Sequence, residues 1–425
     1  MSAIVVARQE SSITIQITVP LTRSLLDTEH GIQQALNEAG LLATTEALRQ
    51  FDTDGAAIQV GPSRYTSKGQ EAKDYQTPYG EATVARHVYQ TSQGGVTFCP
   101  LERDARIILT ATPRFAQMVS HKYAEMAGGR VVTDLCANHG RKTCLNVIQR
   151  LADAVGAVAQ AKEESWHYAT PQLDQAVASV GIGLDGTCML LVEDGYRQAM
   201  VGTLSLYGHD GARLHTIYTA ATPEYGKETF YQRLGREIQH VQQLYPRARL
   251  TGCADGAEDN WAFLTPYTAD NCVDFHHATS YLRLAARAAY PQSFKGREEW
   301  LDQRCHQLKH DRGAAQAILT ELESLASREL NEAAREGLDK ATTYFRNQQE
   351  RMDYARRTKA NLPIGSGVTE AACKTLVKMR LCRSGAKWRE QGAAVVLSLR
   401  TLSYTTGRWD QFWAKIDRYG FPVED

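Results

Sequence analysis

The alternation of apolar and polar residues predicts the elements of the N-terminal part of the chain. Residues 12–19 alternate strictly, which predicts one strand. Apolar residues then recur at helical spacing over about 23–50, which predicts a long amphipathic helix. Residues 51–110 are richer in Gly, Thr and Tyr and contain short strand-like pieces. We therefore expect an N-terminal α+β region over residues 1–110.

Helix signals dominate residues 111–165. Thr112 before Pro113 is a typical helix start, because a capping hydroxyl precedes a proline at the first helical position. Helices are predicted over about 113–127, 131–138 and 141–162, with glycines between them. This pattern resembles a helix-turn-helix, although helical hairpins also occur in proteins of other function. Near the start of the last helix lie side chains of the types that contact bases and phosphates: Arg141, Lys142, Asn146 and Gln149.

A mixed sheet is predicted over residues 178–280. Apolar runs at 181–193, 198–206 and 214–220 are separated by short polar turns, which predicts three antiparallel strands. A helix over about 225–243 then crosses to a strand at 249–254, which should lie parallel to the first strand. A helix at about 257–265 and a fifth strand at 271–277 complete a ribonuclease-H-like order of elements.

The rest of the chain is predicted to be helical. The spacing of apolar residues from about 278 to 350 indicates helices throughout, so we expect an all-helical insertion over residues 281–360. Residues 361–425 should return as C-terminal helices of the sheet domain. The predicted fold class is α/β: a mixed-sheet catalytic domain with a helical insertion, preceded by the α+β region and the helix-turn-helix.

Composition narrows the class of protein. A chain of 425 residues is long enough for two or three domains, and 43% hydrophobic with 23% charged residues is typical of a soluble globular protein. No apolar run approaches the roughly 20 residues that span a bilayer, and the N-terminus lacks the pattern of a secretory signal. The nine cysteines form no Cys-x-x-Cys pair, which favours reduced thiols and no structural zinc. We expect a cytoplasmic protein without a membrane partner.

A net charge of zero conceals an asymmetry along the chain. Residues 1–60 hold three basic and seven acidic side chains, a balance of −4. Residues 351–408 hold twelve basic and three acidic side chains, a balance of +9. Such a local excess indicates a phosphate-binding face or, alternatively, a solvated helix surface. The candidate DNA-binding side chains here are Lys374, Lys378, Arg380, Arg383 and Lys387.

Three acids give the predicted mixed-sheet domain its candidate chemistry. Asp185 lies inside an apolar strand, Asp255 follows a strand 70 residues later, and Glu370 opens a helix after a Gly-Ser-Gly turn. Asp185 alone could cap a turn, and Glu370 alone could be an acid favoured by the helix dipole. Together they predict a site for two Mg²⁺ ions, with Mn²⁺ as a substitute, because hard cations prefer oxygen ligands. Two such ions promote in-line displacement at phosphorus.

The motifs around these acids carry a family resemblance. They are Gly-Leu-Asp-Gly-Thr at 183–187, Cys-Ala-Asp-Gly at 253–256 and Ile-Gly-Ser-Gly-Val-Thr-Glu at 364–370. Asp274 and His277 match a Cys/Asp-x-x-His signature, and segments 51–55 and 86–90 are also similar. The chain resembles DDE transposases of bacterial insertion sequences, in the ISKra-type branch related to the Mutator-like elements.

The resemblance implies a ribonuclease-H-like domain whose helical insertion precedes the last catalytic acid. It implies catalytic Asp185, Asp255 and Glu370, with Asp274 and His277 in the same site. It also implies Mg²⁺-dependent cleavage of the element's ends, transfer of the freed 3′-hydroxyl to target DNA, and a homo-oligomer on two ends of double-stranded DNA at the bacterial nucleoid. The resemblance further implies that the N-terminal part of the chain binds the terminal inverted repeats.

Several alternatives stay open at the level of sequence. His277 could be a packed core histidine or could support the substrate phosphate without being an obligatory metal ligand; we favour the second. The same fold could serve a simple metal-dependent nuclease without strand transfer. A catalytically silent, sequence-specific DNA-binding protein would share the helix-turn-helix.

Overall fold

The computed structural model describes residues 2–163 and 165–421 of the chain. The chain divides into two compact units. Unit 1 comprises Met1–Tyr168, Ala394–Ser403 and Gly407–Asp425, and unit 2 comprises Ala169–Ala393 with Tyr404–Thr406. The predicted C-terminal segment 361–425 is therefore shared between the two units.

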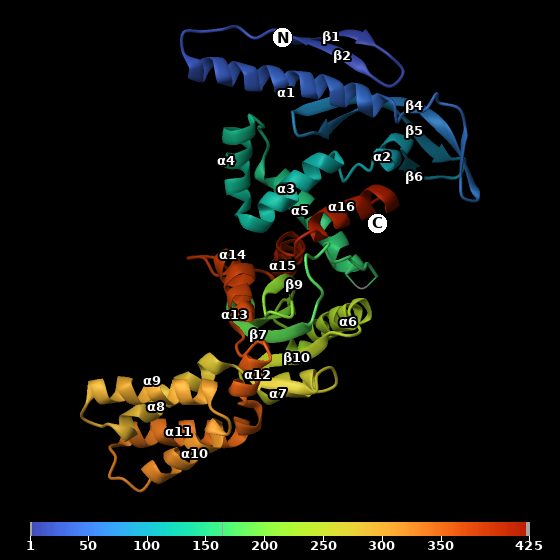
Figure 1. Cartoon of the computed structure of the whole chain (residues 1–425). Coiled ribbons are helices and arrows are strands. Elements are labelled where there is room, and N and C mark those ends of the chain that lie inside the picture. The colour runs from blue at the N-terminus through green and yellow to red at the C-terminus, as the bar shows by residue number, and fades with distance from the viewer. Residues whose placement is uncertain (1, 164, 422–425) are drawn as a thin grey trace. The chain divides into compact units, whose positions relative to one another are not determined.

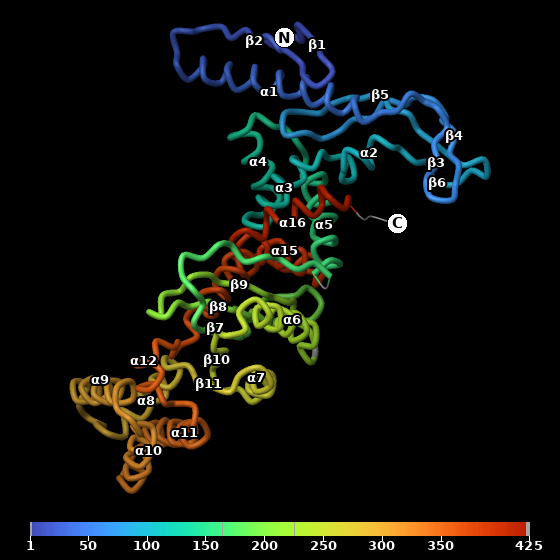
Figure 2. The backbone as a smooth tube through the Cα atoms, turned by 45° about the vertical axis from the view of Figure 1, so that its right-hand side comes forward, coloured from blue at the N-terminus to red at the C-terminus, as the bar shows by residue number. Residues whose placement is uncertain are grey.

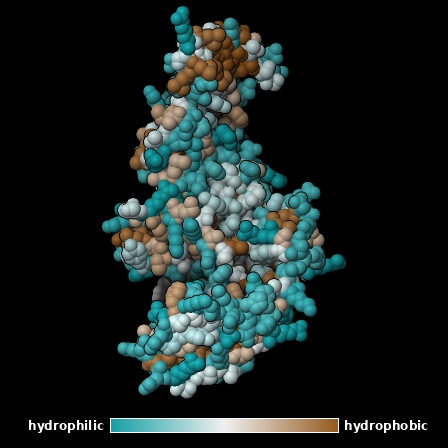
Figure 3. Space-filling view, turned by 60° about the vertical axis from the view of Figure 1, so that its left-hand side comes forward, coloured by the Kyte–Doolittle hydropathy of each residue, from teal (hydrophilic) through white to brown (hydrophobic). Residues whose placement is uncertain are grey.

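Unit 1 begins with a hairpin and a long helix. Strands β1 (Ala3–Arg8) and β2 (Ile13–Ile17) pair antiparallel, and helix α1 (Leu25–Arg49) follows. Ser24 caps α1 by accepting a hydrogen bond from the main-chain N–H of Asp27. The strand and helix predicted at 12–19 and 23–50 are confirmed, and β1 is an additional strand. Eight large apolar side chains between Ile4 and Leu36 are exposed, and Figure 3 shows apolar atoms gathered at this end of unit 1.

The module predicted at 51–110 contains an antiparallel sheet in the order β3-β4-β5-β6. Its strands are β3 (Ile58–Val60), β4 (Ser63–Gln76), β5 (Glu81–Thr91) and β6 (Gly94–Phe98), and the short helix α2 (Pro100–Asp104) follows. A core of Leu48, Tyr75, Ala82, Val84 and Leu101 joins α1, this sheet and α2. The predicted β-containing module is thus present.

The three helices predicted over 111–165 are present with shifted bounds. They are α3 (Pro113–Glu125), α4 (Gly128–His139) and α5 (Leu145–Lys162). The last helix begins four residues later than predicted, because Gly140 ends α4 in the left-handed conformation, with φ of 61°, and residues 141–144 form a loop. The C-terminal helix α16 (Arg408–Tyr419) and most of α15 (Glu390–Tyr404) also belong to unit 1.

Unit 2 is built on a five-stranded mixed sheet in the order β11-β10-β7-β8-β9 (Figure 1). Its strands are β7 (Ser179–Leu191), β8 (Gly195–Tyr207), β9 (Arg213–Ala221), β10 (Arg249–Ala254) and β11 (Asp270–Val273). Strands β7, β8 and β9 are antiparallel, whereas β10 is parallel to both β7 and β11. The predicted meander, the crossover and the parallel fourth strand are confirmed.

Helices α6 (Glu228–Leu244) and α7 (Glu258–Leu264) make the connections to β10 and β11. A 3-10 turn, Tyr225–Lys227, precedes α6. Phe230, Leu234, Ile238 and Val241 of α6 are buried in one core with the apolar side chains of the sheet, such as Ile182 and Leu204. This apolar stripe holds the crossover helix on the sheet.

The predicted helical insertion is present and packs on the sheet. It contains α8 (Phe275–Ala289), α9 (Phe294–His310), α10 (Ala314–Leu325) and α11 (Glu332–Gln348). Figures 1 and 2 show these helices grouped beyond the β10–β11 edge of the sheet. Leu282, Ile318 and Phe345 share a core with the strands, so the insertion and the sheet form one packed body.

The chain returns from the insertion through short helices. These are a 3-10 turn (Gln349–Arg351), α12 (Tyr354–Lys359), α13 (Gly367–Ala372), a π-helical segment (Cys373–Lys378) and α14 (Met379–Leu381). π-helical turns are rare and occur frequently at functional sites. Within the described residues, no helix is long and apolar enough to cross a membrane.

Candidate functional site

Register alone brings Asp185 and Asp255 to the same edge of neighbouring strands. In the parallel pair of β7 and β10, Gly183 lies opposite Cys253, and each aspartate follows two residues later. Both side chains are partly exposed. The Asp255 carboxylate accepts hydrogen bonds from the main-chain N–H of Ala257 (3.1 Å) and the Asn260 amide (3.0 Å), which fixes its orientation.

The helix that carries Glu370 packs against these strands. Thr369 of α13 lies 2.8 Å from Thr203 of β8, hydroxyl to hydroxyl, in the buried interior. The Cys373 thiol donates to the Asp185 carboxylate, with 3.7 Å between Sγ and Oδ2. Glu370, one helical turn before Cys373, is exposed in the first turn of α13. The three predicted acids thus come from two adjacent strands and one helix.

Electrostatics ties the three acids together. Burial raises the pKa of Asp185, and the negative charges of Asp255 and Glu370 raise it further. A cation among the carboxylates would relieve this repulsion. An all-oxygen donor set of this kind fits Mg²⁺ or Mn²⁺ better than it fits a soft metal.

Asp274 corrects the prediction of a fifth strand over 271–277. Strand β11 ends at Val273, and Asp274 is the N-cap of α8, accepting from the main-chain N–H of His277 at 2.8 Å. His277 therefore lies on a helix. Asp274 is fully buried and also accepts from the main-chain N–H and the hydroxyl of Ser366, the latter at 2.8 Å. This geometry makes Asp274 a positioning residue and does not support direct contact with substrate.

His277 lies beside Glu370. Its Nε2 is 3.9 Å from Oε1 of Glu370, and both side chains are nearly half exposed. One ligand atom each of Asp274, His277 and Glu370 lies within 4.8 Å of the others, a grouping that differs from the predicted metal set of Asp185, Asp255 and Glu370. Because the Asp274 oxygens already accept three hydrogen bonds, His277 and Glu370 are the accessible members.

Ser366 is a site residue that sequence reasoning did not single out. Its hydroxyl lies 2.8 Å from Oδ2 of Asp274 and 3.3 Å from Oε1 of Glu370. Ser366 therefore connects the start of α8 to the acid on α13. Its place in the Gly-Ser-Gly turn of the motif at 364–370 was the available signal, but only Glu370 of that motif was given a chemical role.

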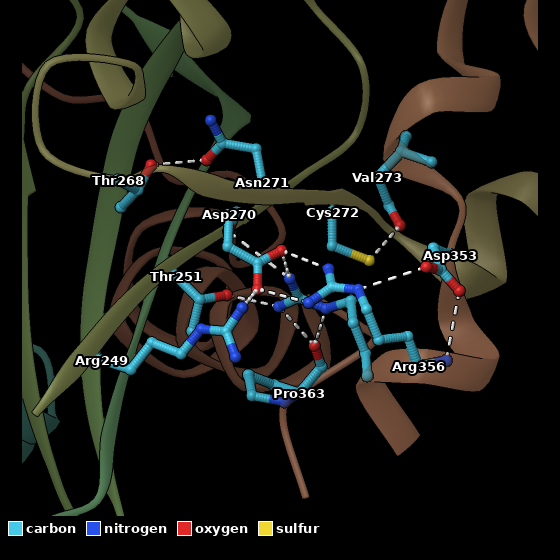
Figure 4. A network of polar contacts seen from close by, with 11 residues as sticks. Arg249, Thr251, Thr268, Asp270, Asn271, Cys272, Val273, Asp353, Arg356 and Pro363 are labelled. Carbon is cyan, nitrogen blue, oxygen red and sulfur yellow. Dashed lines mark hydrogen bonds and ion pairs between the residues drawn. The ribbon is translucent and has the colours of Figure 1, made fainter. Parts of the chain in front are cut away.

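An arginine network anchors the segment that leads to this turn. Figure 4 shows Arg249, Thr251, Arg356 and Pro363 around Asp270 at the edge of the sheet. Arg357, also buried there, donates to the Asp270 carboxylate (2.7 Å), to the Thr251 hydroxyl and to the main-chain oxygen of Pro363 (2.8 Å). Burial raises the pKa of Asp270, but the hydrogen bond from Arg356 and the charges of the three arginines outweigh this effect and hold the pKa below its ordinary value.

The predicted DNA contacts in unit 1 need one correction. Arg141 is 5% exposed, and its guanidinium lies 5.0 Å from the centre of the Phe115 ring. It donates to the main-chain oxygens of Thr77 (2.9 Å) and Lys142 and to the side chain of Gln76. These occupied donors make Arg141 a structural residue that holds the loop before α5. Three other predicted side chains are exposed: Lys142, Asn146 and Gln149.

A similar correction applies to the basic segment of unit 2. Arg380 is 3% exposed and stacks on Trp388, with 5.0 Å between the guanidinium carbon and the ring centre. Its predicted contact with DNA is therefore not supported. Four predicted side chains are exposed and stay available: Lys374, Lys378, Arg383 and Lys387. Lys374 and Lys378 lie within the π-helical segment, so their four-residue separation does not put them on one face as it would in an α-helix.

No protein-family model matches this chain, and a search of curated proteins finds no match either.

Proposed function

We propose that this protein is a DDE transposase that cleaves the ends of an insertion sequence and joins them to target DNA. Unit 2 would be its ribonuclease-H-like catalytic domain, because the strand order and the crossover helix have the arrangement expected of that fold. The observation that carries the proposal is the register that sets Asp185 and Asp255 two residues beyond a paired position of β7 and β10, with Asp255 and Glu370 of α13 near enough for their charges to raise the pKa of Asp185. The proposal includes Mg²⁺, with Mn²⁺ as a substitute, as the cofactor.

Each residue has a role that its position supports. Asp185, Asp255 and Glu370 would hold the metal ions. Bound Mg²⁺ would activate the attacking oxygen and stabilise the leaving oxygen at phosphorus. His277, exposed beside Glu370, can donate a hydrogen bond to a phosphate oxygen. Asp274 fixes His277 through the cap of α8 and fixes the turn before α13 through Ser366.

DNA binding would use exposed basic and amide side chains in both units. In unit 1, α3, α4 and α5 would act as a helix-turn-helix, with Lys142, Asn146 and Gln149 at the start of the last helix. In unit 2, Lys374, Lys378, Arg383 and Lys387 would contact the phosphates near the acids. We also propose that the protein acts in the bacterial cytoplasm as a homo-oligomer on two DNA ends.

The test is cleavage of labelled duplexes made from the DNA that flanks the gene, with Mg²⁺, by wild type, Asp255→Asn and Asp259→Asn. Asp259 is an exposed acid on the neighbouring helix α7, so its substitution is the matched control. We expect wild type and Asp259→Asn to nick the end junction and to form joined products, and Asp255→Asn to bind DNA without cleaving it.

Other results would assign a different function. Cleavage without joined products would favour a metal-dependent nuclease of the same fold. Tight binding by all three proteins, with no cleavage under Mg²⁺ or Mn²⁺, would refute the enzyme and favour a DNA-binding protein with silent chemistry.

A further inference from the structure

Two side chains of the helical insertion hold the main chain at Asp255. The Tyr344 hydroxyl donates to the main-chain oxygen of Asp255 at 3.0 Å. One turn later on the same helix, the Gln348 amide donates to the main-chain oxygen of Gly256, also at 3.0 Å. Consecutive carbonyls of the turn that carries a candidate metal ligand are thus bound by α11, a helix more than 75 residues further along the chain.

The surroundings of Tyr344 keep its hydroxyl in place as a donor. Its ring stacks on Tyr281 of α8, with 3.9 Å between ring centres and 14° between planes. Burial, followed by the nearby Tyr281 and Asp255, raises the pKa of Tyr344. On the same helix, Leu338, Ala341 and Phe345 are buried in the core shared with the sheet. The donor is therefore mounted on a well-packed element.

Gly256 shows how closely the turn and the insertion fit. Its φ is +109°, a conformation that other residues adopt only with strain. A Cβ atom at this position would lie 3.3 Å from the Tyr344 ring and 3.4 Å from the Gln348 amide. A residue as free as glycine needs external contacts to hold one conformation, and the contacts come from these two side chains.

We propose that Tyr344 and Gln348 are positioning residues for Asp255, so that the helical insertion sets the geometry of the metal-binding carboxylate from outside the sheet. This inference rests on the proposed function, in which Asp255 holds metal. The Asp255 carboxylate receives its own hydrogen bonds from the main-chain N–H of Ala257, the N-cap of α7, and from the side chain of Asn260 within α7, so these bonds come from the segment after the turn and not from the insertion. The hydrogen bonds from Tyr344 and Gln348 hold that turn on helix α11 of the insertion.

The test compares Mn²⁺ binding by the full chain, measured by calorimetry and electron paramagnetic resonance, in wild type, Tyr344→Phe and Tyr231→Phe. Phenylalanine keeps the stacked ring and removes the hydroxyl. Tyr231 is the matched control, because it also stacks on a ring, that of Phe263 at 4.8 Å, but its buried hydroxyl has no hydrogen-bond partner among the residues that the structure describes. Gln348→Met removes the second donor and keeps nearly the same side-chain length. It takes the place of Tyr344→Phe if that variant does not fold.

Loss of one hydrogen bond should weaken Mn²⁺ binding by roughly 2- to 10-fold in Tyr344→Phe and leave it unchanged in Tyr231→Phe. Raising the Mg²⁺ concentration should restore cleavage by Tyr344→Phe, which a general loss of folding would not allow. Equal Mn²⁺ affinity in wild type and both donor variants would overturn the positioning role and leave the proposed function intact. Absence of Mn²⁺ binding by wild type itself would instead refute the proposed function.

Discussion

Replacing Asp274 by asparagine separates the charge of this buried carboxylate from its shape. In wild type, one oxygen accepts from the N–H of His277 and the other accepts from the N–H and hydroxyl of Ser366. Asparagine is a good N-cap, so its single oxygen can still serve α8. Its NH₂ group then faces the N–H and the hydroxyl of Ser366, which lose the acceptor that they share in wild type. The turn before α13 should loosen while the helix start is kept.

The free-energy cost of this substitution depends on which of the Ser366 donors can find another acceptor. The Ser366 hydroxyl can turn to Oε1 of Glu370, 3.3 Å away, whereas its main-chain N–H is buried and has no such alternative. Leaving a buried donor unsatisfied costs about 1–3 kcal/mol, and a hydrogen bond to a charged group contributes about 1.5–3 kcal/mol. Because these two quantities overlap, we expect a local loss of about 2–4 kcal/mol. At 1.4 kcal/mol for each factor of ten, this corresponds to faster opening by roughly 30- to 700-fold.

Native-state hydrogen exchange measures this loss where it occurs, because a chain with two units need not unfold in one transition. The Ser366 amide should exchange faster by the factor given above, and DNA cleavage should fall with it. The control is Asp353→Asn, which changes an exposed N-cap of α12. If the Ser366 amide kept its wild-type protection in Asp274→Asn, the carboxylate would not be what holds the turn.

Four further predictions concern charge and metal. Arg141→Ala should lower the unfolding temperature without changing the salt dependence of DNA binding, whereas Lys142→Ala should reduce the salt slope by about one phosphate contact and leave stability unchanged. Arg357→Met should destabilise unit 2 by about 1–3 kcal/mol in denaturant unfolding, because the buried acceptors at Thr251 and Pro363 lose their donor while Arg249 and Arg356 stay paired with Asp270. The pKa of Asp270 is lower in the folded protein than in the unfolded chain, so its ionised carboxylate stabilises the fold. This stabilisation is complete above the unfolded pKa of ~3.9 and is lost as the pH falls through the lower folded pKa. Asp270→Asn should therefore flatten the acid limb of a profile of melting temperature against pH. The raised pKa of Asp185 has the opposite effect on stability. Metal-free protein should lose stability as the pH rises from the unfolded pKa of ~3.9 through the higher folded pKa. In the same melting experiment, Mg²⁺ at 100 times its Kd should add about 2.7 kcal/mol of stability.

Periodicity identified most elements of unit 2 and fewer of unit 1. Strands β7, β8 and β9 contain apolar stretches separated by short polar turns, and α6 has a clear apolar face, so their order and pairing followed from the sequence. Strand β1 has five consecutive apolar residues, from Ala3 to Ala7, and no alternation. Strand β4 is long but mostly polar and exposed. Such strands are stabilised by pairing with a neighbouring strand. The pattern of apolar and polar residues along one segment carries no information about that pairing.

The end of β11 shows how a local signal overrides an apolar run. The sequence from Asn271 to His277 alternates enough to suggest a strand, but Asp274 is a strong N-cap and takes the N–H of His277. The cap turns the chain into α8 three residues early and moves His277 from a strand edge to a helix start. This displacement places His277 beside Glu370, so the correction changes the chemistry of the site as well as the secondary structure.

Charge in a sequence does not tell whether that charge is free to act. Arg380 was grouped with neighbouring lysines as a phosphate contact, yet its guanidinium packs on Trp388. Tyr344 and Gln348 carry no charge and escaped attention, although they bind the main-chain carbonyls of the candidate metal ligand Asp255 and of Gly256 after it. Side chains that bond to main-chain oxygens leave no periodic trace, because any carbonyl can accept. Positions of acids can therefore be predicted from strand register, whereas the residues that hold them depend on long-range packing, and mutagenesis chosen by charge alone would miss both Tyr344 and Ser366.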